Sequence, residues 1–266
     1  MTFSTGLTRL RPDQARAHRK LSAVPIRQRL GSAATMPPDL SAFLPDVLDQ
    51  GQTSSCVGHG GAAATFAACN AAVALGYPGA AALPFVPSPD DLYRLVRCRE
   101  RLSKYEALTD SGANIADVLD VITRFGVRPI QPMPGDRYSD VYEGTVNREP
   151  TLDDLVRDAT AVLVDVDSHP LASDPAEFDD ALSHGAMILI AVPGGADEWQ
   201  SYSGGEMPAI ASRPDPDHCV CLYRSRAGQN SWGATQWGEA GRFRLSDAFV
   251  RTNVYEAFAL SVRKAA

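Results

Sequence analysis

The sequence predicts an α+β fold in which helices dominate the first half of the chain and strands dominate the second. Apolar residues recur with helical spacing through the first half, whereas short runs of β-branched and other apolar residues fill the second. This segregation differs from the regular alternation of strand and helix that a parallel βαβ fold requires. The chain has 266 residues, 44% of them hydrophobic, which is enough for one large domain or two lobes.

The helices are expected from periodicity and from their end signals. A short helix is expected over 12–21, within an N-terminal extension covering 1–37. The run 56–75 is rich in Ala and Gly and predicts a closely packed, buried helix, whose start Ser54 or Ser55 can cap. Gly76 is the expected stop signal of that helix. The remaining helices are expected over residues 90–104, 113–125, 151–158 and 175–182.

Strands are expected where short apolar runs are bounded by turn residues. The segment 226–229, Arg-Ala-Gly-Gln, is poor strand material, so the sequence predicts no strand there. The predicted strands cover residues 161–166, 187–192, 218–223, 241–245 and 254–262.

Charge is distributed unevenly along the chain. The net charge of −7 argues against a general nucleic-acid-binding protein, which is usually basic. The segment 1–30 is strongly basic, so the rest of the chain is more acidic than the total suggests. A basic arm of this kind can fold back onto an acidic body, or it can stay a solvated terminus. Its basic residues are Arg9, Arg11, Arg16, Arg19, Lys20, Arg27 and Arg29, against the single acid Asp13.

The cysteines and the N-terminus indicate a reducing compartment. No apolar signal sequence precedes the body of the chain, and the run 56–75 is too weakly hydrophobic to predict a membrane span. The five cysteines suggest no disulfide framework. We therefore expect a cytoplasmic protein, or one exported without a recognisable signal peptide, and no membrane partner. Cys219 and Cys221 have a metal-type spacing beside His218, but no second ligand pair exists, so neither a metal nor a cofactor is expected.

Cys56 is the leading candidate for a nucleophile. It lies where a polar loop enters the predicted helix 56–75. A helix N-terminus offers free N–H groups and the positive end of a dipole, which lower the pKa of a thiol and favour the reactive thiolate. The alternative is that Cys56 is a small buried core residue, which is the commonest role of a free cysteine.

His218 is the candidate base. It lies far downstream of Cys56, at the start of a predicted strand, where an imidazole can face a groove and exchange a proton near neutral pH. The alternative is a hydrogen-bonded structural histidine. That structural role is assigned to the other four histidines, among which His59 lies one helical turn from Cys56: His18, His59, His169 and His184.

A third segment, NSWGATQWGEAGRFRL from Asn230, resembles the signature that surrounds the orienting asparagine in the papain family of cysteine peptidases. The run from Asp110 to Val127 is most similar to bacterial members that lack the family disulfides. The resemblance implies a two-lobed fold over 38–266, with the active-site cleft between the lobes. The helical lobe would cover about 50–130 and a β-barrel-like, strand-rich lobe about 131–266.

The resemblance also implies the roles of individual residues. Gln50 stands six positions before Cys56, as in the family, and would donate its amide to the oxyanion hole with the Cys56 N–H. Asn230 would hold the His218 ring, and Trp232 would shield that hydrogen bond from water. The segment Asp110-Ser111-Gly112 resembles the one that pairs with the substrate backbone, so Ser111 and Gly112 are expected substrate-binding residues.

Taken together, these residues predict a cysteine endopeptidase acting through a Cys-His-Asn triad and a thioester acyl-enzyme, with protein or peptide substrates. Residues 1–37 would be its own inhibitory, cleft-blocking segment. The chain departs from the family in having Val57 after the nucleophile, Thr53 in place of a disulfide cysteine, and only the short segment 219–229 between His218 and Asn230. Two alternatives stay open: a cysteine-dependent acyl transferase or deamidase, and a catalytically weak papain-like binding protein.

Overall fold

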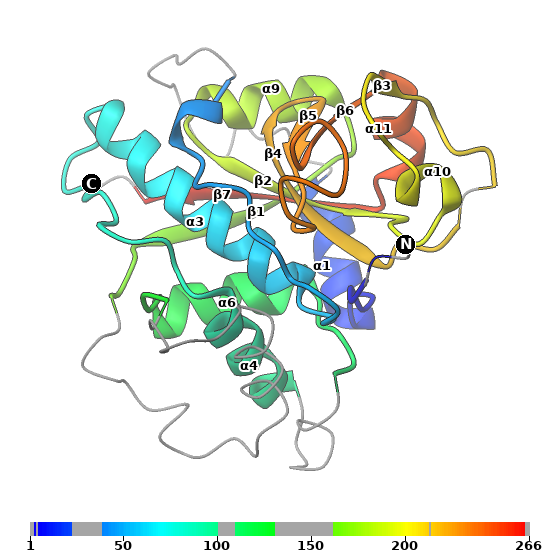
Figure 1. The fold of residues 1–266 in the computed structure, drawn as a ribbon. Coiled ribbons are helices and arrows are strands. Elements are labelled where there is room, and N and C mark those ends of the chain that lie inside the picture. Colours follow the sequence, from blue (N-terminus) through cyan, green and yellow to red (C-terminus); the bar gives the residue numbers. More distant parts are fainter. Residues whose placement is uncertain are drawn as a thin grey trace.

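The computed structural model describes residues 3, 5–22, 39–100, 110–130, 162–212 and 214–263, with the side chains of 19–22 and 98–100 left out (Figure 1). The helix expected over 151–158 and the end of the one expected over 90–104 lie outside the described residues. The observed architecture is α+β, with helices concentrated early and a seven-stranded sheet built from the second half, as predicted.

Most expected helices are confirmed to within a few residues, and the short helices η1, α10 and α11 were not predicted. In the part of the chain described, no helix combines the length and the apolar character needed to cross a membrane. The helices are α1 (Pro12–Ser22), η1 (Ser41–Phe43), α3 (Cys56–Ala74), α4 (Pro89–Glu100), α6 (Ile115–Phe125), α9 (Pro175–Ser183), α10 (Asp197–Gln200) and α11 (Asp247–Asn253).

The strands form one sheet in the order β1-β7-β2-β4-β5-β6-β3, antiparallel except for the parallel pair β3 and β6. The central strands β2, β4 and β7 are almost wholly buried, which their continuous apolar sequences explain. The strands are β1 (Val166–Leu171), β2 (Met187–Val192), β3 (Glu206–Met207), β4 (His218–Arg224), β5 (Ala227–Gln229), β6 (Arg242–Leu245) and β7 (Glu256–Val262).

The strand predicted over 161–166 is wrong in position. The strand β1 begins only at Val166, because its pairing with β7 starts at the Val166–Val262 pair. Val162 makes an isolated bridge to Val127 instead. The β1 sequence VDSHPL is polar and contains a proline, which is acceptable because β1 is the edge strand of the sheet.

The prediction that no strand forms over 226–229 is also wrong. Residues Ala227–Gln229 form β5, which pairs with β4 on one side and with β6 on the other. A Cβ at Gly228 would lie 2.3 Å from Cζ of Phe243 and 2.6 Å from the carbonyl oxygen of Cys221. Pairing and close packing therefore select this segment as a strand, and its low intrinsic preference is overridden.

Helix α3 is the central element of the fold. Figure 1 shows α3 crossing the molecule with α4 and α6 on one side and the strands β4 and β5 on the other, and α3 contacts α4, α6, β2, β4 and β7. Because its residues are small, helices and strands approach it from all sides, and nearly all of its residues are buried. Its first residue, Cys56, is thereby placed where the helical and strand-rich parts meet.

Candidate active site

Cys56 is the first residue of α3, and its side chain is completely buried. The expectation that a serine caps this helix is wrong. Ser55 occupies the N-cap position, but its hydroxyl contacts Thr53 Oγ1 at 2.8 Å and His59 Nδ1 at 3.2 Å. The N–H groups of the first turn of α3 are therefore not capped by that side chain, and those of Gly58 and His59 donate to the Ser55 carbonyl at 2.9 and 3.2 Å.

His218 and Asn230 are brought together by the β4–β5 hairpin. His218 begins β4, and Asn230 directly follows β5. The His218 Nε2 atom lies 2.7 Å from Asn230 Oδ1, and both side chains are buried. The short connection 219–229 thus holds the two side chains in hydrogen-bonding contact.

A backbone hydrogen bond determines the tautomer of His218. The Ser231 N–H donates to Asn230 Oδ1 at 2.7 Å, so this atom must be the amide oxygen and an acceptor. His218 Nε2 must then carry the hydrogen that it donates to Asn230, and Nδ1 carries the free lone pair. Nδ1 has no hydrogen-bond partner among the described residues. The arrangement leaves Nδ1 able to accept a proton.

Aromatic rings cover this pair. The Trp232 ring lies 4.6 Å from the His218 ring, centroid to centroid, and Trp232 is 1% exposed. The Trp199 ring approaches His218 from another side at 6.4 Å. Trp237 packs edge-on against Trp232 and donates its Nε1–H to the carbonyl of Trp199 at 2.7 Å. These rings keep water away from the His218–Asn230 hydrogen bond, which strengthens it.

Gln50 ties the loop before Cys56 to the loop after β5. Its backbone N–H donates to the Ser231 carbonyl at 2.8 Å, and its Oε1 accepts from the Ser231 hydroxyl at 2.5 Å. Its Nε2 donates to the carbonyl of Thr53 at 2.6 Å. Gln50 is 1% exposed, so its amide is held in place rather than free in solvent.

The N-terminal segment pairs with the chain on both sides of this site. The N–H groups of Gly6 and Leu7 donate to the Asp217 carbonyl at 2.9 and 2.8 Å. On the other side, the Ala113 N–H donates to the Gly6 carbonyl at 2.9 Å, and the Thr8 N–H donates to the Ala113 carbonyl at 2.8 Å. Residues 6–8 therefore bridge the segment before α6 and the residue before His218.

The same segment lies against the loop before Cys56 and against Trp232. Phe3 stacks on the Trp232 ring with centroids 4.5 Å apart and planes 6° apart. A Cβ on Gly6 would lie 2.0 Å from the carbonyl oxygen of Ser54, and one on Gly112 would lie 2.0 Å from that of Gly6. Gly112 has a φ of 76°, and its neighbour Ser111 is exposed. Only glycines permit these backbone approaches.

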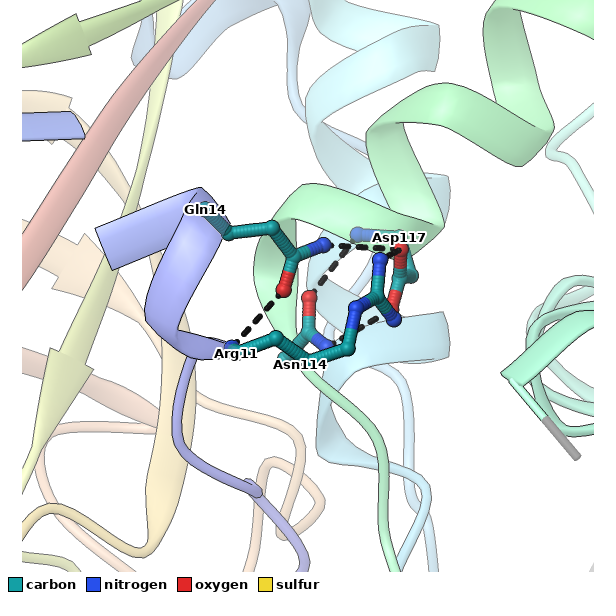
Figure 2. A network of polar contacts seen from close by, with 4 residues as sticks. All are labelled: Arg11, Gln14, Asn114 and Asp117. Carbon is teal, nitrogen blue, oxygen red and sulfur yellow. Dashed lines mark hydrogen bonds and ion pairs between the residues drawn. The ribbon is translucent and has the colours of Figure 1, made fainter. Parts of the chain in front are cut away.

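Helix α1 is joined to α6 by a polar network centred on Asp117 (Figure 2). Arg11 donates to both Asp117 oxygens, at 2.6 and 3.0 Å, and Gln14 Nε2 donates to Oδ1 at 2.9 Å. Asn114 caps α6 and donates its Nδ2–H to Asp117 Oδ2 at 2.7 Å. The Asp117 side chain is 2% exposed and that of Arg11 47% exposed. A buried carboxylate is thus satisfied in part by the guanidinium of the N-terminal segment.

Comparisons with known proteins show which fold this is. No family model matches the chain, and no curated protein matches its sequence. Solved structures do match. Xylellain, a cysteine protease from Xylella fastidiosa, superposes with a TM-score of 0.65 at 20% identity, over 99% of this chain and 98% of that one. The chain has the papain-like fold.

Two further structures agree with this papain-like fold. The Carica candamarcensis cysteine protease CMS1MS2 in complex with E-64 gives a TM-score of 0.59 at 18% identity, over 86% of this chain and 98% of that one. A digestive procathepsin L 3 from the larval midgut of Tenebrio molitor gives a TM-score of 0.58 at 19% identity, over 98% of this chain and 84% of that one. The two-lobed fold implied by the sequence resemblance is thereby confirmed.

The expected low pKa of the Cys56 thiol is contradicted by its burial. Burial raises the pKa of Cys56 to about 12, only partly offset by hydrogen bonds from the backbone of Cys219 and Gly6. Burial likewise lowers the pKa of His218 to about 4, against the opposing effect of its hydrogen bond with Asn230. Burial therefore favours the neutral thiol of Cys56 and the neutral imidazole of His218, because each charged form would be desolvated.

Sequence reasoning missed the residues that hold the N-terminal segment against the rest of the chain. Asp217 acts through its backbone carbonyl, which no side-chain motif can reveal. Asp117 lies in the first turn of α6, where an acidic residue is explained by the helix dipole alone. The excess of arginine near the N-terminus was the one available signal, and it did not indicate a partner.

Proposed function

We propose that this protein is a cysteine endopeptidase in which Cys56 is the nucleophile, His218 the base and Asn230 the residue that orients it. One observation carries the proposal: the 2.7 Å contact between His218 Nε2 and Asn230 Oδ1, with Ser231 fixing the amide orientation. That arrangement gives Nδ1 the free lone pair. The backbone of Cys219, the residue next to His218, lies near enough to the Cys56 thiol to lower its pKa, which supports placing sulfur and imidazole in one site.

In the proposed reaction, His218 Nδ1 takes the Cys56 proton as the sulfur forms a bond to the peptide carbonyl carbon. The Cys56 N–H and the Gln50 amide would stabilise the oxyanion. His218 then gives its proton to the leaving amine as the C–N bond breaks, which leaves a thioester. Water, deprotonated by His218, attacks the thioester, and the sulfur leaves and regains a proton. Peptide and water are the only reactants.

We further infer that the described arrangement is a latent state, inhibited by the chain's own N-terminal segment. Residues 6–8 pair with Asp217 and Ala113 on both sides of the site, and Phe3 covers Trp232. An extended peptide substrate would need the same backbone groups. Arg9 also forms an exposed ion pair with Asp215, which contributes little to closure.

Labelling with a thiol-reactive epoxide of the E-64 type tests the peptidase proposal. The full-length protein is incubated with the probe, and the modified residue is identified by peptide mass spectrometry. We expect modification at Cys56 that is lost in His218→Ala. No modification of Cys56 under any condition would favour the binding-protein alternative. Release of ammonia from glutamine peptides without chain cleavage would favour the deamidase.

Gly194→Ala is expected to lower the rate of Cys56 labelling at least about tenfold, because the position of the catalytic imidazole is critical. A Cβ at Gly194 would lie 2.3 Å from His218 Cβ, so the histidine backbone must shift. The matched control is Gly195→Ala, whose Cβ would meet only the side chain of Asp217, with Oδ2 at 2.5 Å, which can rotate away. Equal rates in the two variants, with unchanged circular dichroism, would contradict the placement of His218.

The Cys56 thiolate is expected to be absent at neutral pH in the full-length protein. The measurement is the ultraviolet thiolate absorbance against pH, taken as the difference between the parent and Cys56→Ala. Burial raises the pKa of Cys56 to about 12 from 9.0, so the enclosed state binds the proton more tightly. The folded state therefore keeps this contribution to its stability below pH 9 and loses it as the pH rises from 9 toward 12. A difference signal with a midpoint near neutral pH would contradict an enclosed, desolvated thiol.

A further inference from the structure

The segment 110–113, which precedes α6, presents backbone groups to the site. Ala113 exchanges hydrogen bonds with Gly6 and Thr8, so an extended chain adds to this edge as a strand does. The segment itself belongs to neither a helix nor a strand of the sheet. Side-chain hydrogen bonds fix the position of the segment instead.

Two side chains fix the position of this segment: Tyr93 of α4 and Asp110 of the segment itself. The buried Gly112 N–H donates to the Tyr93 hydroxyl at 2.9 Å, and that hydroxyl donates to Asp110 Oδ1 at 2.8 Å. Asp110 Oδ2 accepts from the Ser54 N–H at 2.9 Å. Tyr93, in α4, is completely buried, whereas Asp110 is exposed at the surface. This chain of hydrogen bonds runs from the edge segment to the loop that leads into Cys56.

We propose that Tyr93 and Asp110 are positioning residues that keep the 110–113 edge in register with Cys56, so that an extended peptide binds with its scissile bond at the sulfur. The proposal rests on the peptidase function proposed above. It assigns the two residues no contact with the reacting atoms.

These hydrogen bonds join the 110–113 edge to the loop before Cys56, and a substrate bound to both requires a fixed distance between them. Ser54 lies two positions before Cys56, and its carbonyl lies close to Gly6, while Gly112 lies close to the Gly6 carbonyl. Because position 53 is a threonine, no disulfide can tie down the loop there. Asp110 therefore supplies a non-covalent link, with Oδ2 accepting from the Ser54 N–H and Oδ1 from the Tyr93 hydroxyl.

Removing the Tyr93 hydroxyl would leave a buried Gly112 N–H without its acceptor, which is costly, and would release Asp110 from one partner. The edge would then lose its fixed distance from the nucleophile loop. A substrate that uses only the Cys56 end of the site would be unaffected. One that also pairs with Gly112 and Ala113 would bind more weakly.

The test compares two substrates in the full-length protein. One is a blocked tripeptide p-nitroanilide chosen for cleavage by the parent, and the other is the p-nitrophenyl ester of its blocked C-terminal amino acid. The quantity measured is the ratio of kcat/KM for the two. The fraction of molecules with the N-terminal segment displaced multiplies both rates, so it cancels from the ratio.

We expect Tyr93→Phe to lower this ratio about tenfold, mainly by raising KM for the tripeptide. Asp110→Ala should lower the ratio by a similar factor, and its exposed position leaves the core untouched. Asp110→Asn keeps one acceptor oxygen and should give an intermediate ratio. The matched control is Tyr77→Phe, which removes another buried hydroxyl, donated to the His184 carbonyl at 2.7 Å. Its ratio should match that of the parent.

Equal losses for both substrates, or a lower thermal midpoint with an unchanged ratio, would overturn the positioning role and leave a purely structural one. A parent that cleaves the ester but no peptide would refute the peptidase function itself, and so would the absence of any cleavage in the Arg11→Ala variant, which loosens the N-terminal segment. In that event the proposal for Tyr93 and Asp110 falls with it.

Discussion

Cys56→Ala is expected to reduce peptide hydrolysis at least about a thousandfold, to the uncatalysed background. The thiol is the nucleophile of the proposed reaction, so the variant without it cannot form the thioester. The measurement is kcat/KM for a fluorogenic peptide. Asn230→Ala should retain a measurable remnant, because Asn230 orients His218 without touching substrate.

The matched control for this experiment is Cys69→Ala on the same helix. Cys69 is also buried, at 4% exposure, but it lies near the other end of α3. We expect it to keep near-parental activity with a modest loss of stability from the deleted sulfur. Full activity in Cys56→Ala, or an equal loss in both variants, would show that the nucleophile is wrongly assigned.

Arg11→Ala is expected to raise the rate of Cys56 labelling in the full-length protein about fivefold to thirtyfold. Arg11 holds the N-terminal segment to Asp117 through two hydrogen bonds, and the carboxylate is almost fully buried. Because the guanidinium is half-exposed, we count only about 1–2 kcal/mol for this pair. Its loss destabilises the closed state by that amount and increases the open fraction accordingly.

The control for the segment is Arg124→Ala. Arg124 lies in the same helix α6 and pairs with Asp120 at 2.9 Å, one turn away, without touching the N-terminal segment. It should leave labelling unchanged. Gln14→Ala should give a smaller increase than Arg11→Ala, since it removes one neutral donor to Asp117. Unchanged labelling in Arg11→Ala and Gln14→Ala would contradict inhibition by this segment.

Much of the fold was predictable because its signals are local. The end of α6 at Gly126, the start of α3 at Cys56 and the apolar run of β2 each follow from a cap, a turn or a periodic pattern within a short stretch of chain. The predictions that failed concern strands whose existence or position depends on partners from other parts of the chain. The strand β5 exists because β4 and β6 offer partners on both sides, and β1 begins where β7 can pair with it.

The candidate site shows the same division. The positions of Cys56 at a helix start and of His218 at a strand start follow largely from the sequence pattern, whereas Asn230 follows β5, a strand that the sequence did not predict. The sequence did not predict the direction in which the Cys56 pKa is shifted. A helix N-terminus predicts a lower pKa, whereas burial raises it to about 12. Burial is a property of everything packed around the sulfur, including Gly6 in the distant N-terminal segment.

By itself, the sequence determined the succession of a helix-rich first half and a strand-rich second half, the papain-like resemblance and the residue types at the site, because periodicity and motifs act over short stretches of chain. The tertiary structure alone decided three things: the tautomer of His218, the charge state of the enclosed thiol and imidazole, and the place of the N-terminal segment. Each depends on hydrogen bonds or desolvation between residues far apart in sequence, as between Arg11 and Asp117 or Gly6 and Asp217.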